Sequence, residues 1–424
     1  MNNYLTEDTK AIILLCGVFG KDRTENPLSH TEYSSLVNWL IRGKMRPADL
    51  LEKEYIADAS NGAGIEKKRL ESLLGRGVKL GFAVEEWQRN GIWIISRSDE
   101  DYPTRYKSHL KDKAPPLLFG AGDRSLLNGG GLGIVGSRNV DQDGEDFTRQ
   151  VAELCAANRM PVVSGGARGV DKIAMGAALE AGGITIGILA ENLLRKSIER
   201  TARYAISDGR LLLLSPYHPG ARFTVGTAMA RNKLIYALVD YGLVVSAEYK
   251  KGGTWAGAEE ELKRDISRPV FVRIGNKVPK GNEKLMDIGT IAWPVSIELD
   301  NLGQQLSDLA GSKQNKKQQK SMSIFDYKVK RHRKKVEGAN KDIHTVAEQK
   351  PGEYKVEPTE DKPGVTIYDA VLPIILRKLE NAVSIEELSR SLDVNKTQLN
   401  AWLKKAVDEK KIKKLTKPVR YKKE

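Results

Sequence analysis

The fold is decided by residues 164–171, which read Ser-Gly-Gly-Ala-Arg-Gly-Val-Asp. This turn follows the apolar run Pro161-Val162-Val163 and leads into a segment with helical periodicity. A second turn, Gly136-Ser137-Arg138, follows the apolar run Leu132–Val135. A strand, a glycine turn and a helix together gather free backbone N–H groups at the helix N-terminus, where anions bind. The two turns therefore predict a surface for more than one phosphate, as in a nucleotide or a nucleic-acid backbone.

Short apolar runs alternate with helical segments from about residue 115 to residue 300. The candidate strands are 117–119, 133–135, 162–163, 184–189, 211–214, 243–246 and 270–274, preceded by 92–95. The candidate helices between them are 145–158, 171–181, 197–207 and 228–240. Such alternation implies right-handed crossovers and a sheet covered on both faces. The predicted fold class is α/β with a Rossmann-like, mainly parallel sheet, whose ligands bind at the carboxyl ends of the strands.

Changes in composition divide the 424 residues into four predicted regions. Apolar stripes at helical spacing predict a helical N-terminal domain over residues 1–90. The Rossmann-like domain takes residues 91–305, and a basic disordered linker takes residues 306–364. Three short helices (372–379, 384–392 and 395–407) and a terminal hairpin predict a winged helix-turn-helix over residues 365–424.

The chain is basic, with 69 Lys and Arg against 55 Asp and Glu, a formal net charge of +14. That balance favours polyanionic partners, although it bears on association rather than on fold. The run at residues 328–335, Lys-Val-Lys-Arg-His-Arg-Lys-Lys, is expected to act as a nonspecific tether to a phosphate backbone. Few aromatic residues lie near the glycine turns in sequence, so we expect base stacking to contribute less than phosphate contacts.

Several classes of protein are disfavoured. No apolar run approaches the roughly 20 residues of a membrane span, and the first residues lack a basic segment followed by an apolar one, so we expect a cytoplasmic protein without a signal peptide. The two cysteines, Cys16 and Cys155, lie among apolar neighbours and are expected to be buried free thiols. Two distant cysteines and five scattered histidines do not supply a zinc site, and no cofactor is predicted.

The two arginines in the turns are the strongest candidates for phosphate contacts, because a guanidinium beside free N–H groups can clamp a phosphate through two hydrogen bonds. Two further features are Phe223 with Arg231-Asn232-Lys233, and the turn Lys250–Thr254 after a strand. Each has a plainer interpretation, in which Arg231 and Lys233 lie on a solvated helix face and Lys250 and Lys251 are surface charges. Asp171, at the end of the turn over residues 164–171, would likewise be a helix N-cap.

Residues from about 85 to 275 resemble the DprA/Smf family of DNA-processing proteins, which belongs to a wider Rossmann-like superfamily (SLOG). The matching pieces occur in the family's order: Tyr102-Pro103, residues 115–120, residues 134–138, residues 164–171, residues 231–235 and Gly252-Gly253-Thr254. The helical N-terminal region and the C-terminal segment also fit the longer members of that family.

The resemblance implies a protein that binds single-stranded DNA along a basic pocket, self-associates as a homodimer and helps a RecA-type recombinase to load onto incoming DNA. It implies no catalytic residue and no membrane partner. The DNA-binding positions that it implies are Gly136, Ser137, Arg138, Ser164, Gly165, Gly166, Arg168, Gly169, Arg231, Asn232, Lys233, Gly252, Gly253 and Thr254.

Three positions depart from the family pattern. Met175 replaces a histidine that is common four residues after the family's aspartate, and residues 224–230 replace a proline followed by two basic residues. The usual acidic residue after the late strand corresponds to Ser246 or is displaced to Glu248. These departures leave the fold prediction intact but leave the pathway open between DNA uptake and a DprA-like role in anti-phage defence.

Two alternative functions remain open. Residues 251–259 resemble part of the nucleoside-monophosphate phosphoribohydrolase motif, with Glu259 near the position of the catalytic glutamate, but Trp255-Ala256 replaces its Gly-Thr pair. The second alternative function is that of a nucleotide-sensing module joined to a DNA-binding head. The predicted recognition helix around residues 396–405 and the basic hairpin after it favour contact with duplex DNA, although many winged helices bind proteins instead.

Overall fold

The computed structural model describes residues 5–19, 26–275, 277–294 and 300–312, and most of residues 372–423. Contacts divide the chain into two compact units, Met1–Lys335 and Val336–Glu424, each of which has its own core. Most of the predicted linker lies outside the described residues. Its first part, residues 306–312, is helical and continues a helix from residue 302, with Leu306 buried.

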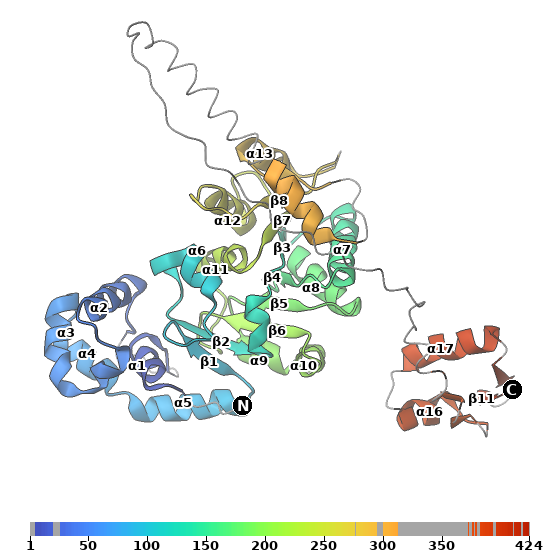
Figure 1. Cartoon of the computed structure of the whole chain (residues 1–424), viewed down its shortest axis with the longest axis horizontal. Helices are drawn as coiled ribbons and strands as arrows, with labels where there is room; N and C mark the ends of the chain where they lie inside the picture. The colour runs from blue at the N-terminus through green and yellow to red at the C-terminus, as the bar shows by residue number, and fades with distance from the viewer. Residues whose placement is uncertain are drawn as a thin grey trace, which may run out of the picture. The chain divides into compact units, whose positions relative to one another are not determined.

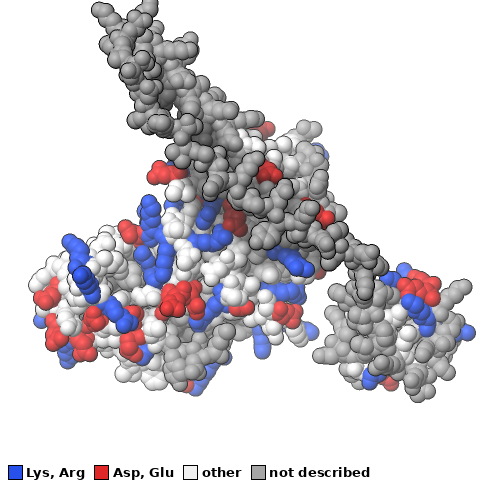
Figure 2. Space-filling view, viewed as in Figure 1, with Lys and Arg blue, Asp and Glu red and all other residues white. Residues whose placement is uncertain are grey.

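The first unit begins with helices that pack together around Leu36, Leu70 and Trp87 (Figure 1). They are α1 (Glu7–Cys16), α2 (His30–Arg42), α3 (Ile56–Ala63), α4 (Lys67–Leu74) and α5 (Gly77–Arg89), with 3-10 turns at Pro47–Leu51 and Lys53–Tyr55. Their core continues into Ile94 and Phe119 of the sheet, so these helices pack on the sheet. On the face drawn in Figure 2, basic and acidic side chains are interspersed over them.

A nine-stranded sheet forms the centre of the unit, in the order β1-β2-β6-β5-β4-β3-β7-β8-β9. The strands are β1 (Trp93–Ser96), β2 (Leu117–Ala121), β3 (Leu132–Gly136), β4 (Val162–Ser164), β5 (Thr185–Ile188), β6 (Leu211–Ser215), β7 (Tyr241–Ser246), β8 (Val270–Val272) and β9 (Ile291–Ala292). Strand β2 pairs antiparallel with β1 and β6, and all other pairs are parallel. The predicted α/β class with a mainly parallel sheet is confirmed.

Helices cover both faces of the sheet. One face carries a core that includes Tyr106, Leu234 and Ala258, and the other a core that includes Val151, Ala174 and Leu306. The helices are α6 (Thr104–Leu110), α7 (Gln142–Ala157), α8 (Val170–Glu180), α9 (Leu193–Ile198), α10 (Arg200–Ser207), α11 (Val225–Leu238), α12 (Gly252–Leu262) and α13 (Lys280–Ile288), with 3-10 turns at Lys111–Lys113 and Arg124–Asn128. The single helix predicted over 197–207 is instead two, because Glu199 is non-helical (ψ 137°).

The second unit contains α16 (Ile385–Leu392), α17 (Lys396–Asp408) and the antiparallel hairpin β10 (Ile412–Thr416) and β11 (Val419–Lys423). Val383 forms a β-bridge with Tyr421. Leu388, Leu399 and Ile412 are buried in its core. The predicted recognition helix lies in α17. The helix expected over 372–379 falls partly outside the described residues.

Candidate nucleic-acid interface

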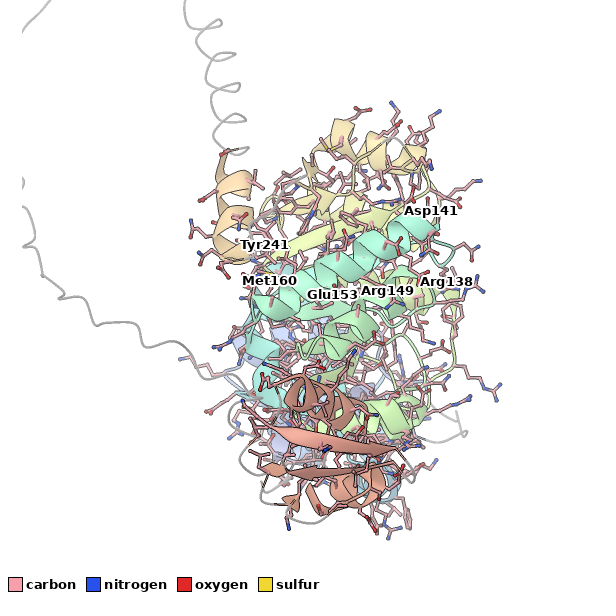
Figure 3. The ribbon with its side chains drawn as sticks, turned by 90° about the vertical axis from the view of Figure 1, so that its right-hand side faces the viewer. Arg138, Asp141, Arg149, Glu153, Met160 and Tyr241 are labelled. Atoms are coloured by element: carbon pink, nitrogen blue, oxygen red, sulfur yellow. The ribbon has the colours of Figure 1, made fainter. Side chains whose placement is uncertain are left out.

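The carboxyl ends of four neighbouring parallel strands meet at one rim of the sheet. Strands β5, β4, β3 and β7 are adjacent and parallel, so the segments that follow them emerge on the same side. In Figure 3, Arg138 lies with Asp141 at the end of the sheet where α7 begins, and Met160 and Tyr241 lie at the other end. The topology therefore brings the predicted glycine turns together, in the position where α/β sheets bind ligands.

The first turn, residues 136–139, is held from two sides. The Thr254 hydroxyl at the start of α12 donates a hydrogen bond to the Gly136 carbonyl (3.1 Å). The Val170 N–H donates to the Ser137 carbonyl (3.2 Å). Gly169 has a φ of +84°, and a Cβ atom there would lie 2.4 Å from the Ser137 oxygen. The second glycine turn thus packs directly on the first, which requires a glycine at residue 169.

Arg168 is exposed, and its guanidinium is engaged by the first turn. Its Nε donates to the Arg138 carbonyl (3.4 Å), and its Nη2 donates to the Asn139 side-chain oxygen. A guanidinium carries five N–H donors, so others remain for a ligand. Arg168 therefore joins the two turns as well as adding charge beside them.

Arg138 is exposed and stacks on an aromatic ring. Its guanidinium carbon lies 4.8 Å from the ring centroid of Phe223, which is in the loop before α11. Within the described residues no ion pair engages Arg138, so its charge is available to an anion. Proximity in sequence did not indicate this pairing, because 85 residues separate the two side chains.

Arg231 is buried, with 4% of its side chain exposed, and so does not lie on a solvated helix face. Its Nη1 lies 3.5 Å from Oδ2 of Asp171, which is inside α8, while Gly169 occupies the N-cap position. Burial raises the pKa of Asp171, and the charge of Arg231 partly offsets that rise. Burial also lowers the pKa of Arg231. Arg231 thus provides a buried, partly neutralised positive charge under the turns.

Two adjoining cavities lie over these residues. The rim pocket, with a volume of about 330 Å³, is lined by residues that include Ser137, Asp171, Asn232, Lys251 and Thr254. The side pocket, of about 700 Å³, is lined by residues that include Gly165, Gly166, Arg168, Glu191 and Lys196. Arg138, Phe223 and Arg231 line both cavities. The structure therefore forms one basic groove across the strand ends.

Most of the predicted site residues line these cavities. Asn232 also donates a hydrogen bond to the Gly253 carbonyl (2.8 Å), which joins α11 to α12. Ser164 is buried and donates to the Ile134 carbonyl (2.6 Å), so it supports the sheet. Lys233 lines neither pocket. Burial is the main cause of the lowered pKa of His30, and the positive charge of Lys233 lowers it further. Sequence reasoning had passed over Lys196, Val225 and Met229 as site residues.

Glu259 lies outside both pockets, although the hydrolase alternative depends on it. Its carboxylate accepts hydrogen bonds from Lys263 (3.0 Å) and from the Trp255 indole (3.2 Å). The Lys263 hydrogen bond is the main cause of the lowered pKa of Glu259. A glutamate held ionised away from the cavity is poorly placed for acid–base catalysis there.

Within the described part of the chain, no group of three or more His, Cys, Asp or Glu residues is placed to hold a metal ion. None of the helices in that part combines the length and the apolar character needed to cross a membrane.

The fold and the groove define a Rossmann-like α/β protein with a basic groove at the carboxyl ends of its parallel strands. Residues 93–299 match the family model "DNA recombination-mediator protein A". The chain is 30% identical over 237 residues to Protein Smf of Synechocystis sp., covering 53% of this chain and 55% of the relative. It is 34% identical over 181 residues to the DNA processing protein DprA of Streptococcus pneumoniae, covering 42% and 61%. The chain belongs to the DprA/Smf family.

The solved structure of DprA from Streptococcus pneumoniae has a similar fold. It matches with a TM-score of 0.55 at 23% identity, over 68% of this chain and 95% of that chain. The matched regions span little more than half of the length of the curated relatives described above. The family and the fold are therefore established for the central part of the chain.

Proposed function

We propose that the protein binds single-stranded DNA through the groove formed by the rim and side pockets, without a chemical step. The observation that carries the proposal is the convergence of Arg138, Arg168 and Arg231 on two glycine turns. Phosphates bind well to guanidinium groups and to free backbone N–H groups. A continuous groove with several cations suits a polymer of phosphates better than a single small anion.

The role in recombination is a further part of this proposal. We propose that the protein assists a RecA-type recombinase and that its active form is a homodimer. The matching family model is named for a recombination mediator, which supports the first of these two roles. The α17 helix and the β10–β11 hairpin support a winged-helix role in binding duplex DNA. The +14 charge of the chain favours both nucleic-acid partners.

The experiment measures the affinity of the full chain for unstructured oligonucleotides of different sequence over a range of salt concentrations. Arg138→Ala should weaken binding to all sequences alike and reduce the slope of log K against log[salt] by about 1. Arg168→Ala should also weaken binding, because it loses a charge and releases the first turn. The matched control is Arg149→Ala, a half-exposed arginine on α7 that pairs with Glu145 and Glu180.

Two results would contradict the proposal. One is an Arg138→Ala protein that binds every strand as tightly as the unmodified chain at each salt concentration. The other is base release from nucleoside monophosphates by the unmodified chain, abolished by Glu259→Gln, which would favour the hydrolase.

A further inference from the structure

A second groove lies along helix α7, outside the DNA-binding groove. It consists of two adjoining cavities, of about 520 and 300 Å³, which share Phe147, Gln150 and Ile274. None of the residues that line these two cavities also lines the rim pocket or the side pocket. This α7 groove therefore takes no part in the DNA binding proposed above.

One end of the α7 groove is apolar. Phe147, Val151 and Leu154 line it from α7. Trp293 lines it from the end of β9 and contacts Phe147 edge to face, with ring centroids 6.2 Å apart. Ile274, which follows β8 and lines both cavities, is 45% exposed. Because exposing apolar side chains to water is unfavourable, this end favours a ligand that carries apolar side chains.

The other end carries exposed carboxylates. Asp143 and Asp146 line it from the first turns of α7. The Asp143 side chain is 61% exposed, and its ion pair with Lys277 is long, at 3.9 Å. Arg273 also lines this end, but it is buried and its Nε donates to the Val245 carbonyl (3.1 Å). Exposed carboxylates accept hydrogen bonds from lysine and arginine side chains. The α7 groove therefore matches a peptide with apolar residues next to basic ones.

The chain itself contains such a peptide. Residues 322–331 read Met-Ser-Ile-Phe-Asp-Tyr-Lys-Val-Lys-Arg, so that Ile324, Phe325 and Tyr327 directly precede the basic run. Residues 313–321, before this segment, are polar or charged throughout. Both stretches lie outside the described residues. The basic run was expected to contact DNA, which gives the apolar residues before it no role.

The connection to this segment is long enough to reach the α7 groove. The helix over residues 302–312 packs on the core that contains Val151 and Trp293, which also line the groove. Eleven residues, 313–323, join that helix to Ile324. A chain of that length spans up to about 40 Å, whereas α7, with its 16 residues, is about 24 Å long. The segment can therefore reach either end of the groove.

We propose that the α7 groove docks residues 324–330 of the same chain. The apolar residues of this segment lie against Phe147 and Ile274, and its lysines lie beside Asp143 and Asp146. A tethered segment is favoured over a peptide in solution, because the tether gives it an effective concentration on the order of millimolar. Docking thereby fixes the start of the basic run to the first unit.

The experiment measures the affinity of a labelled synthetic peptide of residues 321–331 for the full chain. It contains no DNA, so its outcome does not depend on the proposed function. The peptide should bind the full-length Phe325→Ser/Tyr327→Ser variant about tenfold more tightly than the unmodified chain, or better. The reason is that the tethered segment competes for the groove only in the unmodified chain.

Further changes in the Phe325→Ser/Tyr327→Ser variant locate the binding site. Adding Ile274→Ser should weaken peptide binding about tenfold, because apolar contact is lost. Adding Asp143→Asn/Asp146→Asn should reduce the salt dependence of peptide binding. The matched control for Ile274→Ser is Val78→Ser, which changes another exposed apolar residue (76%) on α5 and should leave peptide binding unchanged. Thermal unfolding should show that all these variants fold.

Three results would overturn the docking proposal. One is equal affinity of the peptide for the unmodified chain and the Phe325→Ser/Tyr327→Ser variant, or binding to neither. Another is peptide binding that Ile274→Ser leaves unchanged, because the peptide would then bind outside the α7 groove. The third is an unmodified chain that binds the peptide as tightly as the variant once the protein is diluted. In that case the segment docks on a second copy and not within its own chain.

Discussion

Gly165 is required at the residue scale because Arg231 occupies the space that a side chain would take. A Cβ atom added at Gly165 would lie 1.1 Å from Nη1 of Arg231. Arg231 is a buried side chain paired with Asp171, so it has little freedom to move aside. The absence of a side chain at Gly165 therefore leaves room for the buried guanidinium of Arg231, in addition to forming the turn.

We expect Gly165→Ala to lower the free energy of unfolding by about 1–3 kcal/mol, as overpacking of a buried site does. It should also weaken binding of single-stranded DNA, because Arg231 lines both pockets. The control is Gly176→Ala in α8, where an added Cβ meets no atom within 4 Å and should stabilise the helix by up to about 1 kcal/mol. Chemical denaturation measures the free energy of unfolding of both variants. Equal stability of the Gly165→Ala and unmodified proteins would contradict this account.

The sequence predicts the charged residues of the site better than their environment. Arg138, Arg168 and Arg231 line the groove as expected from their motifs. The burial of Arg231 was missed because the motif around residue 231 does not show that Gly165 leaves room for its guanidinium. The approach of Phe223 to Arg138 was missed because it depends on the path of the loop before α11. The expectation that base stacking contributes less than phosphate contacts stays a prediction.

At the scale of elements, the apolar runs predicted strands β1–β8 well because strands that are buried on both faces are continuous apolar segments. Strand β9 was missed, since Ile291-Ala292 is too short to form a pattern. Helix α2 carries a complete capping box, in which Ser29 and Glu32 hydrogen-bond each other's backbone N–H. Glu32 also pairs with Arg69 of α4.

The Glu32–Arg69 pair predicts an acid-sensitive contribution to the N-terminal helices. Hydrogen bonding from Arg69, the largest cause, lowers the pKa of Glu32 to about 2 from 4.5. A lowered folded-state pKa stabilises the fold above the unfolded value, and this contribution disappears as the pH falls from about 4.5 to about 2. Glu32→Gln should therefore lower stability at pH 7 by about 1 kcal/mol, a figure reduced for solvent exposure, and by less near pH 2.

Thermal unfolding of the Glu32→Gln and unmodified proteins between pH 2 and pH 7 measures this effect. The control is Glu66→Gln, which removes an exposed carboxylate at the start of α4 that makes no side-chain cap. A stability difference between Glu32→Gln and the unmodified chain that stays constant with pH would exclude an ionic origin.

At the scale of the whole molecule, the two compact units predict separable DNA-binding activities. The groove lies entirely in the first unit, while α17 and the hairpin belong to the second. A chain ended after residue 312 should keep its salt-dependent affinity for single strands and lose most of its affinity for duplex DNA. A full-length variant in which the basic residues of 328–335 are replaced by neutral ones distinguishes the contribution of this run to duplex affinity from that of the C-terminal unit. Unchanged duplex affinity in the shortened chain would place duplex binding in the first unit instead, because that unit would then be sufficient for it.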